Sequence, residues 1–401
     1  MRIPPSHVER GTPAFRRINL AVFAAGFSTF MLMYAVQPLL PIFTTEFHIS
    51  AATSSLALSL TTACLAVSML VIGALAEGWS RKPIMSVSLL AAALLTILSS
   101  SVREWPAFLL IRTIEGIAIA GLPALAMAYV GEEIHPDAVG VSMGLYVGSG
   151  ALGGMTGRLL TGVLTDLFSW RPALAVIGAI GVAASVMFSL SLPASARFRP
   201  RSLSIASLLD SYRAHLHDGI ILALVAEAFL ILGTLVTVYN YTAFRLVAPP
   251  YSLSQSIVGA VFGLYLLGFF SSSLIGLLSH RFSRPNLLKA SLATMLAGVA
   301  ITAAHPLAAV ITGIGLVTIG FFGAQAVAST WVGIRAREAK AQASALYLFF
   351  YYMGSSLAGS VGGFFWTAYG WNGVAAFLAV LLLVALAIAN TRLDHDDTKT
   401  N

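Results

Sequence analysis

Twelve apolar runs, each long enough to cross a lipid bilayer as a helix, alternate with short polar segments along this chain. A transmembrane helix needs about 20 predominantly apolar residues. Backbone N–H and C=O groups find no water inside a bilayer, so we expect these runs to be helical. The two-residue alternation of a membrane β-barrel is absent. The predicted spans lie near residues 18–40, 52–76, 84–101, 106–130, 139–165, 171–192, 219–242, 254–279, 286–304, 307–332, 341–366 and 371–391.

A short charged hairpin occurs twice between these runs. Residues 73–83 read GALAEGWSRKP, and residues 276–285 read GLLSHRFSRP, with Gly73 and Gly276 at equivalent positions 203 residues apart. Trp170 and Trp371 follow the fifth and eleventh runs at a similar offset of 201. Repeated six-helix halves are an established plan of secondary transporters. The duplication therefore predicts an all-α membrane protein of two pseudo-symmetric six-helix bundles.

The longest polar segment separates the two predicted bundles. It is rich in arginine, aspartate and histidine and contains a proline. We expect residues 1–193 to form the first bundle, residues 194–218 a cytoplasmic linker, and residues 219–401 the second bundle. Within the linker, residues 207–217 fit either an amphipathic helix on the inner membrane surface or a solvated connection.

Charge is scarce and unevenly placed. Only 10% of the 401 residues are charged, whereas a soluble protein needs roughly a quarter. Eighteen of the 23 Lys and Arg residues fall in alternate segments that include both termini, and three fall in the opposite segments. Basic residues accumulate on the cytoplasmic side of membrane proteins. Both termini should therefore be cytoplasmic, and the net charge of +7 reflects topology rather than nucleic-acid binding.

The beginning of the chain and its single cysteine add two expectations. Four arginines precede the first apolar run, which is long enough to span a bilayer and lacks a clear cleavage site. We interpret it as an uncleaved first helix rather than a signal peptide. Cys64 is the only cysteine, so an intrachain disulfide is impossible.

Several motifs resemble those of the major facilitator superfamily. The hairpin at 73–83 is similar to the superfamily pattern G-x-L-A-D-R-x-G-R-K, with Glu77 in place of the aspartate. Arg112-Thr-Ile-Glu115-Gly116 resembles its R-x-x-x-G motif. The glycines of the fifth run are similar to the motif of drug:proton antiporters, with Arg158 in place of the usual proline. Over the whole chain the pattern is most similar to the YnfM-type inner-membrane transporters. The resemblance implies the superfamily's fold, alternating access and a bacterial inner membrane.

Arg112 and Glu115 are the first candidates for a binding site, because ionisable groups inside a bilayer are costly and mark functional sites. Their spacing of three residues places them on one helix face. In a functional role, Arg112 would face the central cavity and bind an anionic group, or it would control the protonation of Glu115. In a structural role, the two residues would form an ion pair that only neutralises itself. The resemblance adds weight to a functional arginine.

Arg158 and Glu227 are the other two ionisable residues deep inside predicted spans. Arg158 would face either the cavity or the Glu115 carboxylate, and two cavity arginines would favour an anionic substrate. A glutamate in a medium of low dielectric constant is suited to loading and releasing protons, so Glu227 is a candidate proton site. Its alternative is a structural glutamate held by hydrogen bonds. The first span has no acid, so Glu115 or Glu227 would have to carry any coupled proton.

Polar residues within the other spans are candidates for substrate contacts, because small-molecule pockets combine apolar walls with a few placed polar groups. Each could instead be a packing or interfacial residue. Gln37 precedes Pro38, which leaves a backbone carbonyl free. Residues 239–241 fit a gate or an aromatic belt near the outer surface. These candidates are Tyr34, Gln37, Tyr239, Asn240, Tyr265, Gln325, Tyr347 and Tyr351.

The hairpin residues predict a conformational latch on the cytoplasmic side. Glu77 and Arg81 would pair in one state and separate in the other, with Gly73 allowing close helix packing and Arg284 as the counterpart of Arg81 in the second half. For Glu132 and Glu133, which follow the fourth span, we favour ordinary topology-setting charge.

These observations favour a secondary active transporter over other membrane proteins. The chain has no H-E-x-x-H or paired-aspartate cluster of a membrane enzyme, no G-x-x-x-x-G-K-[ST] loop of an ATPase and no filter-like channel segment. We expect no enzymatic activity, no metal and no cofactor, a proton gradient as energy source, and a monomer. Its partners would be the lipid bilayer, a small-molecule substrate and protons. Proton-driven efflux of a drug-like compound or sugar is the first hypothesis. Proton-coupled uptake or facilitated transport of a small organic anion is the alternative.

Overall fold

The described part of the protein is almost entirely helical. A computed structural model describes residues 7–75, 79–197, 205–336 and 338–394, and within these ranges the chain forms no β-sheet, only one isolated bridge between Val8 and Ile134. The helices in the first part of the chain are α1 (Pro13–Tyr34), η1 (Gln37–Leu39), α2 (Leu40–Glu46), α3 (Ala51–Leu75), α4 (Arg81–Ser99), α5 (Trp105–Ile119), α6 (Pro123–Glu133), α7 (Pro136–Leu167) and α8 (Trp170–Ser191). Those in the second part are α9 (Ile205–His217), α10 (Gly219–Val247), α11 (Gln255–Val261), η3 (Phe262–Leu264), α12 (Tyr265–Leu278), α13 (Arg284–Thr302), α14 (Leu307–Arg335), α15 (Lys340–Ile388) and η4 (Ala389–Leu393).

The helices account for twelve crossings of a membrane. Nine helical segments of the described chain are long and apolar enough to cross one. The longest of them, Lys340–Leu393, contains two crossings because the backbone reverses at Gly370, which has φ 59°. The two remaining crossings are α5 together with α6, and α13. The prediction of an all-α protein with twelve transmembrane helices is confirmed.

Proline interrupts two spans that appear continuous in the sequence. The first run, predicted over 18–40, ends as α1 at Tyr34 and continues through η1, with Pro38 in its first turn, into α2. The fourth run, predicted over 106–130, divides between α5 and α6, where Pro123 is the first residue of α6. Proline lacks an N–H and is compatible with the first turn of a helix but not with its interior. Each break therefore begins a new helix within a single predicted span.

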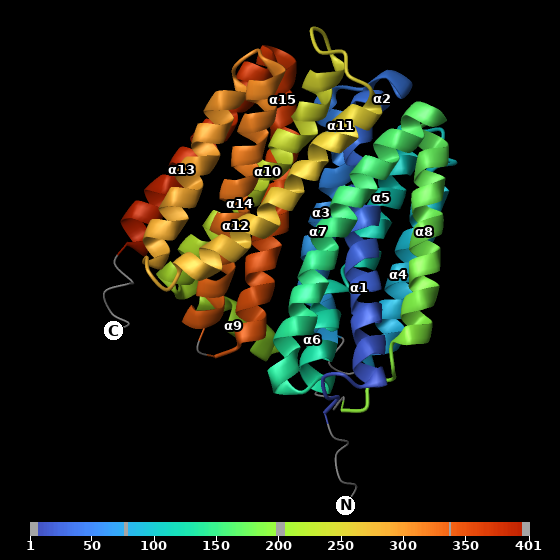
Figure 1. The fold of residues 1–401 in the computed structure, drawn as a ribbon, viewed down its shortest axis with the longest axis vertical. Coiled ribbons are helices and arrows are strands. Elements are labelled where there is room, and N and C mark those ends of the chain that lie inside the picture. The colour runs from blue at the N-terminus through green and yellow to red at the C-terminus, as the bar shows by residue number, and fades with distance from the viewer. Residues whose placement is uncertain (1–6, 76–78, 198–204, 337, 395–401) are drawn as a thin grey trace, which may run out of the picture.

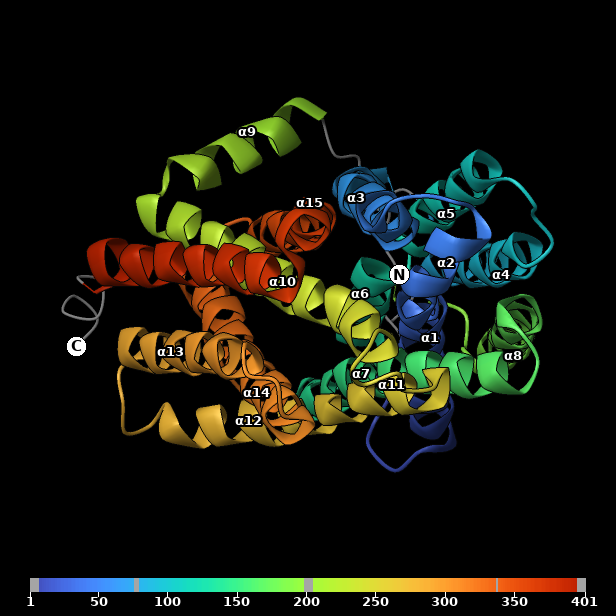
Figure 2. The ribbon, with the colours of Figure 1, turned by 90° about the horizontal axis from the view of Figure 1, so that it is seen from above.

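The helices form two groups side by side (Figures 1 and 2). Helices α1 to α8 lie in one group and α10 to α15 in the other, and the beginning of α1 and α9 lie at the same end of the molecule. The segment predicted as either an amphipathic helix or a solvated connection is helical, as α9, and its Leu209 and Leu216, seven residues apart, are both exposed. Residues 198–204 of the predicted linker lie outside the described ranges.

Equivalent glycines bring helices into contact in both groups. A Cβ atom on Gly153 of α7 would lie 1.9 Å from the Phe27 carbonyl oxygen of α1, and a Cβ on Gly354 of α15 would lie 2.0 Å from the Phe229 carbonyl oxygen of α10. Small residues allow such close approach of membrane helices. Gly153 and Gly354 are 201 positions apart, as are Trp170 and Trp371. The same contact therefore recurs at the same place in each half.

Asp218 joins α9 to α10 and caps the latter. Its Oδ1 accepts hydrogen bonds from the N–H groups of Ile220 (2.9 Å) and Ile221 (3.2 Å), and its Oδ2 accepts one from Nε of Arg335 (2.9 Å). Partial burial raises the pKa of the Asp218 carboxyl, but the hydrogen bonds outweigh it and hold the pKa below its ordinary value. The beginning of α10 is thereby tied to the end of α14.

Candidate functional site

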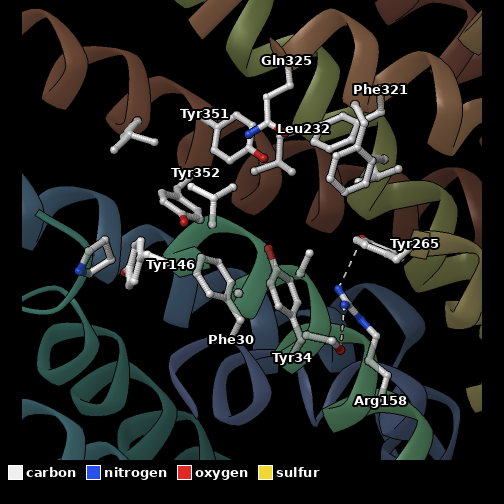
Figure 3. A pocket seen from close by; sticks show the side chains of 18 of the residues that line it. Phe30, Tyr34, Tyr146, Arg158, Leu232, Tyr265, Phe321, Gln325, Tyr351 and Tyr352 are labelled. Carbon is white, nitrogen blue, oxygen red and sulfur yellow. Dashed lines mark hydrogen bonds between the residues drawn. The ribbon is translucent and has the colours of Figure 1, made fainter. Parts of the chain in front are cut away.

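A cavity lies between the two helix groups at mid-length of the molecule. It has a volume of about 190 Å³, and both groups contribute to its mainly apolar and aromatic wall. Figure 3 shows the side chains of Phe30, Tyr34, Tyr146 and Arg158 facing those of Leu232, Tyr265, Phe321, Gln325, Tyr351 and Tyr352 across it. The complete lining is Phe30, Tyr34, Pro123, Met127, Tyr146, Val147, Gly150, Ala151, Gly154, Arg158, Leu232, Leu235, Tyr265, Phe321, Phe322, Gln325, Leu348, Tyr351 and Tyr352.

Among the described residues that line the cavity, Arg158 is the one that carries a charge. Its Nε donates a hydrogen bond to Gln37 Oε1 (2.6 Å), its Nη1 to the Gly154 carbonyl oxygen (3.0 Å) and its Nη2 to the Tyr265 hydroxyl (3.4 Å). Within the described ranges it has no salt bridge. The alternative of a pair with Glu115 is therefore wrong, since Glu115 pairs with Arg112. Arg158 is a buried cation whose charge no carboxylate of the described chain balances.

Aromatic rings surround the Arg158 guanidinium. Its Cζ lies 4.0 Å from the ring centroid of Tyr34, 4.7 Å from that of Tyr265 and 4.9 Å from that of Phe262. The negative faces of aromatic rings attract a cation and offset part of the cost of removing it from water. They do not neutralise it. The site can therefore accept an anionic or strongly polar group of a ligand.

Gln37 connects Arg158 to the second helix group. While its Oε1 accepts the bond from Arg158, its Nε2 donates to Asn240 Oδ1 of α10 at 2.7 Å. Gln37 and Asn240 are 203 positions apart, the offset that separates Gly73 from Gly276. This hydrogen bond thus joins equivalent positions of the two halves across their interface. Asn240 and both of its tyrosine neighbours are fully buried, so the prediction of an aromatic belt at residues 239–241 is wrong.

The arginine itself has no counterpart in the second half. The position 201 residues after Arg158 is Gly359. A Cβ atom there would lie 3.2 Å from Asn240 Nδ2 and 3.5 Å from Ser59 Oγ, and neither of these buried atoms has a hydrogen-bond partner in the described chain. At the centre of the molecule, the amide residues Gln37 and Asn240 therefore occupy equivalent positions of the two halves, whereas the charged Arg158 has only a glycine at its equivalent position.

The two groups contact each other on one side of Arg158. On α7 the cavity lining runs from Tyr146 to Arg158. Beyond Arg158, Gly162 packs on the Gln255 backbone. The Asp166 carboxylate accepts hydrogen bonds from the N–H groups of Gln255 (3.0 Å) and Ser256 (2.7 Å). These contacts close the end that carries α2 and α11, opposite α9 (Figure 1).

A second contact between the two helix groups, between α15 and α3, repeats this closure. Gly363 of α15 packs against Ala52 of α3, where a Cβ would lie 2.4 Å from the Ala52 Cα. Gly162 and Gly363 are 201 positions apart, and Ala52 and Gln255 are 203 apart. The closed end is therefore built from the same contact used twice.

Arg112 and Glu115 form a compact ion pair away from the cavity. The Arg112 Nη1 donates to Glu115 Oε2 at 2.6 Å, and both side chains are fully buried. The remaining donors of Arg112 bond to the carbonyl oxygens of Ala57 (3.1 Å) and Met33 (2.8 Å), and Thr96 donates to Glu115 Oε1 (3.0 Å). The arrangement is the internal ion pair of the two alternatives, and Arg112 does not line the cavity.

Glu227 has surroundings of the opposite kind. It lies in α10 and is fully buried, and neither carboxyl oxygen has a hydrogen-bond partner within the described residues. The hydroxyl of buried Tyr347 likewise has no partner there, and it lies within electrostatic range of the Glu227 carboxyl. The alternative of a glutamate held by hydrogen bonds is therefore wrong. Both residues lie outside the cavity lining.

The other predicted residues divide between the cavity and its support. Tyr34, Tyr265, Gln325 and Tyr351 line it. Tyr239 lies behind Tyr265, with ring centroids 4.9 Å apart and its hydroxyl 2.8 Å from Thr318 Oγ1. Sequence reasoning missed five aromatic residues of the wall. Phe30, Phe321 and Phe322 carry no polar group, and the hydroxyls of Tyr146 and Tyr352 are of the same kind as those of the tyrosines that it named. The four-residue spacings of Phe30 and Tyr34 and of Phe321 and Gln325 indicate shared helix faces.

The proposed hairpin latch is only partly described. Gly73 lies in the last turn of α3 and Arg284 is the first residue of α13, whereas Glu77 lies outside the described ranges. Arg81 Nη2 forms a salt bridge with Glu132 Oε1 at 2.8 Å, and Glu133 Oε1 accepts a hydrogen bond from the Arg197 N–H. The view of Glu132 and Glu133 as topology-setting charge alone is therefore wrong, because both hold neighbouring segments together.

Comparison with known proteins places this architecture in one class. The sequence profile of the Major Facilitator Superfamily matches residues 22–252, more than half of the chain. The chain belongs to this superfamily, and it is a multi-pass membrane transporter.

Individual relatives agree over nearly the whole length. The chain is 47% identical over 381 residues to YybF, an uncharacterized MFS-type transporter of Bacillus subtilis, covering 95% of this chain and 94% of the relative. It is 45% identical over 390 residues to the inner membrane transport protein YnfM of Escherichia coli, covering 97% and 93%. The resemblance to the YnfM-type transporters is thus confirmed.

Solved structures show the same fold at low sequence identity. A bacterial homologue of the human lysosomal transporter Spinster, in an inward-facing and unoccupied conformation, superimposes with a TM-score of 0.81 at 16% identity and covers 96% of this chain and 98% of its own. A point mutant of the nucleoside transporter NupG gives a TM-score of 0.73 at 17% identity, covering 92% and 99%.

Proposed function

We propose that this protein is a secondary active transporter that moves a small organic solute out of the cell by alternating access in exchange for protons. The observation that carries the proposal is the aromatic cavity between the two bundles, closed at one end by repeated contacts and bearing Arg158 next to that closure. Ligand sites of such transporters lie at mid-membrane where the repeated halves meet.

The charge distribution supports an orientation for this cavity. Eighteen of the 23 basic residues lie in segments on the side of the termini, which the positive-inside rule assigns to the cytoplasm. The contacts at Gly162 and Gly363 would then lie on the outer side of the cavity, as expected of a conformation that opens to the inside. In the inner membrane of a bacterium this is the state in which an exporter collects its substrate.

Glu227 is the proposed proton site. Burial of an ionised carboxylate without a partner is so costly that such a group takes up a proton instead. Glu227 has no partner among the described residues, so it would be protonated in this conformation and would release the proton when rocking of the bundles exposes it to water. Glu115 is less suited to this task because Arg112 neutralises it at 2.6 Å.

Proton release from everted membrane vesicles tests the proposal. Vesicles acidified inside by respiration are offered a panel of drug-like cations, organic anions and sugars while a pH-sensitive dye reports the gradient. A transported compound should dissipate the gradient, Glu227→Gln should abolish this response, and Glu227→Asp should retain most of it. A response that persists unchanged with both Glu227 and Glu115 replaced by glutamine would contradict coupling through either residue.

Uptake or facilitated transport of a small organic anion is a second candidate function. Arg158 favours it, because no carboxylate of the described chain balances this cavity cation. The same panel separates the two functions. Efflux predicts dissipation of the gradient in everted vesicles, whereas facilitated transport predicts solute movement that is indifferent to the gradient.

A further inference from the structure

A second hollow adjoins the central cavity on one side. It lies between α7 and α12, has a volume of about 740 Å³, and shares Val147, Ala151, Tyr265, Phe322 and Gln325 with the wall of the central cavity. Because these five residues line both spaces, the two hollows adjoin each other, and we call them together the path. Arg158 and the phenolic groups stand at its inner end.

The outer end of this path faces the region of the lipid. Phe269 and Phe270 of α12 line the second hollow and are 67% and 69% exposed, and Val147 of α7 is 60% exposed. Figure 2 shows α7 and α12 at the same edge of the molecule when it is seen from above. The mouth is therefore lateral, and the side chains that frame it are apolar.

The second hollow offers few polar groups to a ligand. The Ser272 hydroxyl donates to the Phe322 carbonyl oxygen (3.5 Å), the Ser273 hydroxyl to that of Phe269 (2.9 Å), and the Ser329 hydroxyl to that of Gln325 (2.7 Å). On the α7 side, Gly144 and Gly148 have no atom within 4 Å of a Cβ position, so they leave open space. A ligand lying here would gain mainly from burial of apolar surface.

We propose that this path takes a single-chain amphipathic anion from the bilayer, with its anionic group at Arg158 and its apolar portion between α7 and α12. The inference rests on the proposed transport function and names the substrate class of that same site. Arg158 determines the head group of the ligand, since a buried cation without a carboxylate attracts an anion and repels a cation. The lateral mouth favours a ligand with an apolar tail, because a compound dissolved in lipid would reach Arg158 without crossing water.

Photo-cross-linking tests both ends of the path at once. The probe is dodecanoate with a diazirine at its methyl end, added to the whole protein in nanodiscs of uncharged phosphatidylcholine, and labelled peptides are identified by mass spectrometry. We expect labelling in residues 144–155 and 265–273 that excess decanoate suppresses by about tenfold or more. Decanol and decyltrimethylammonium, which match the tail but not the charge, should suppress it little.

Two substitutions and a control locate the head group. Arg158→Gln should reduce the decanoate-sensitive labelling by about tenfold or more, which corresponds to about 1.4 kcal/mol, and Tyr265→Phe should reduce it less. Arg171→Gln is the matched control. Its guanidinium also lies against an aromatic ring, 4.3 Å from the Trp170 ring centroid, but it pairs with Glu46 at 3.1 Å and lies outside the path. Its replacement should leave labelling unchanged.

The outcomes separate this inference from the proposed function. Labelling spread evenly over lipid-facing helices, or equally sensitive to decanol and decanoate, would overturn the inference by showing that ordinary lipid fills the hollow. This competition uses the unaltered protein and does not depend on the folding of Arg158→Gln. Charge-selective labelling without any proton response in vesicles would support the binding path and contradict proton-coupled transport.

Discussion

Two arginines buried in the same bundle illustrate opposite solutions at the scale of single residues. Arg112 directs its three nitrogens to Glu115, Ala57 and Met33, and so connects α5 with α3 and α1. Arg158 bonds to neutral groups and lies against aromatic rings. The ion pair of Arg112 has no net charge and suits a structural role that links helices. The Arg158 side chain leaves a positive charge available to a ligand.

Removal of one partner of the Arg112–Glu115 pair should destabilise the protein strongly. Glu115→Leu leaves an uncompensated guanidinium in a fully buried position, and such changes cost about 3–5 kcal/mol. The double variant Arg112→Met with Glu115→Leu removes both charges and should recover most of this loss. Chemical unfolding in detergent compares the unaltered protein with the single and double variants. Equal stability of the single and double variants would contradict a structural role of the pair.

At the scale of helices, glycine determines which pairs pack in direct backbone contact. The repeated contacts of Gly153 with Phe27 and of Gly354 with Phe229 hold α7 on α1 and α15 on α10. Lipid provides no hydrophobic force between apolar helices, so close van der Waals packing has to associate them. These helix pairs carry most of the residues that surround the cavity, and their spacing therefore sets its width.

Gly153→Val should separate α1 from α7, because even the Cβ atom would lie 1.9 Å from the Phe27 carbonyl oxygen. We expect a destabilisation of about 1–3 kcal/mol, as for other overpacked cores. Gly144→Val in the same helix is the control, since no atom lies within 4 Å of its Cβ position. Thermal unfolding of the purified proteins reports the difference. Similar loss in both variants would point to helix propensity rather than the contact.

At the scale of the whole molecule, the two bundles are joined by a buried side-chain bridge and closed by two glycine crossings. The bridge runs from Arg158 through Gln37 to Asn240. An anion bound to Arg158 would compete for the guanidinium that orients Gln37. Occupancy of the cavity would then weaken the link between the halves, which connects ligand binding to the rocking that exposes the other side.

Asn240→Ala should favour the state in which the outer side is open. In a Cys64→Ser background, Val258→Cys reports this side, because Val258 is buried in α11 next to the closing contacts. Loss of the 2.7 Å bond between Gln37 and Asn240 is worth about 1 kcal/mol. Labelling of intact cells by a membrane-impermeant maleimide should therefore become about fivefold faster.

Asn19→Ala is the matched control for this experiment. The Asn19 amide donates to the Phe15 carbonyl oxygen of its own helix, so its replacement should leave the labelling rate unchanged. An unchanged rate in Asn240→Ala as well would show that the bridge does not hold the outer side closed.

The membrane crossings, the duplication and some local geometry follow from residue order, because each depends on chain-local properties. Span length follows from bilayer thickness, and the three-residue spacing of Arg112 and Glu115 already placed them on one helix face. Even the departures in the first and fourth spans occur at Pro38 and Pro123, whose effect on a helix is local.

Contacts between bundles depend instead on how each helix is rotated about its axis, and helices that are apolar on nearly every face do not reveal this rotation. For this reason only the folded arrangement brings Gln37 to Asn240, directs Arg158 away from Glu115 and towards Tyr265, and pairs Arg81 with Glu132. The cavity aromatics have the same origin. Phe321 and Tyr146 line the cavity because tertiary packing turns them towards the interface. From the sequence alone, either residue could equally well face the lipid.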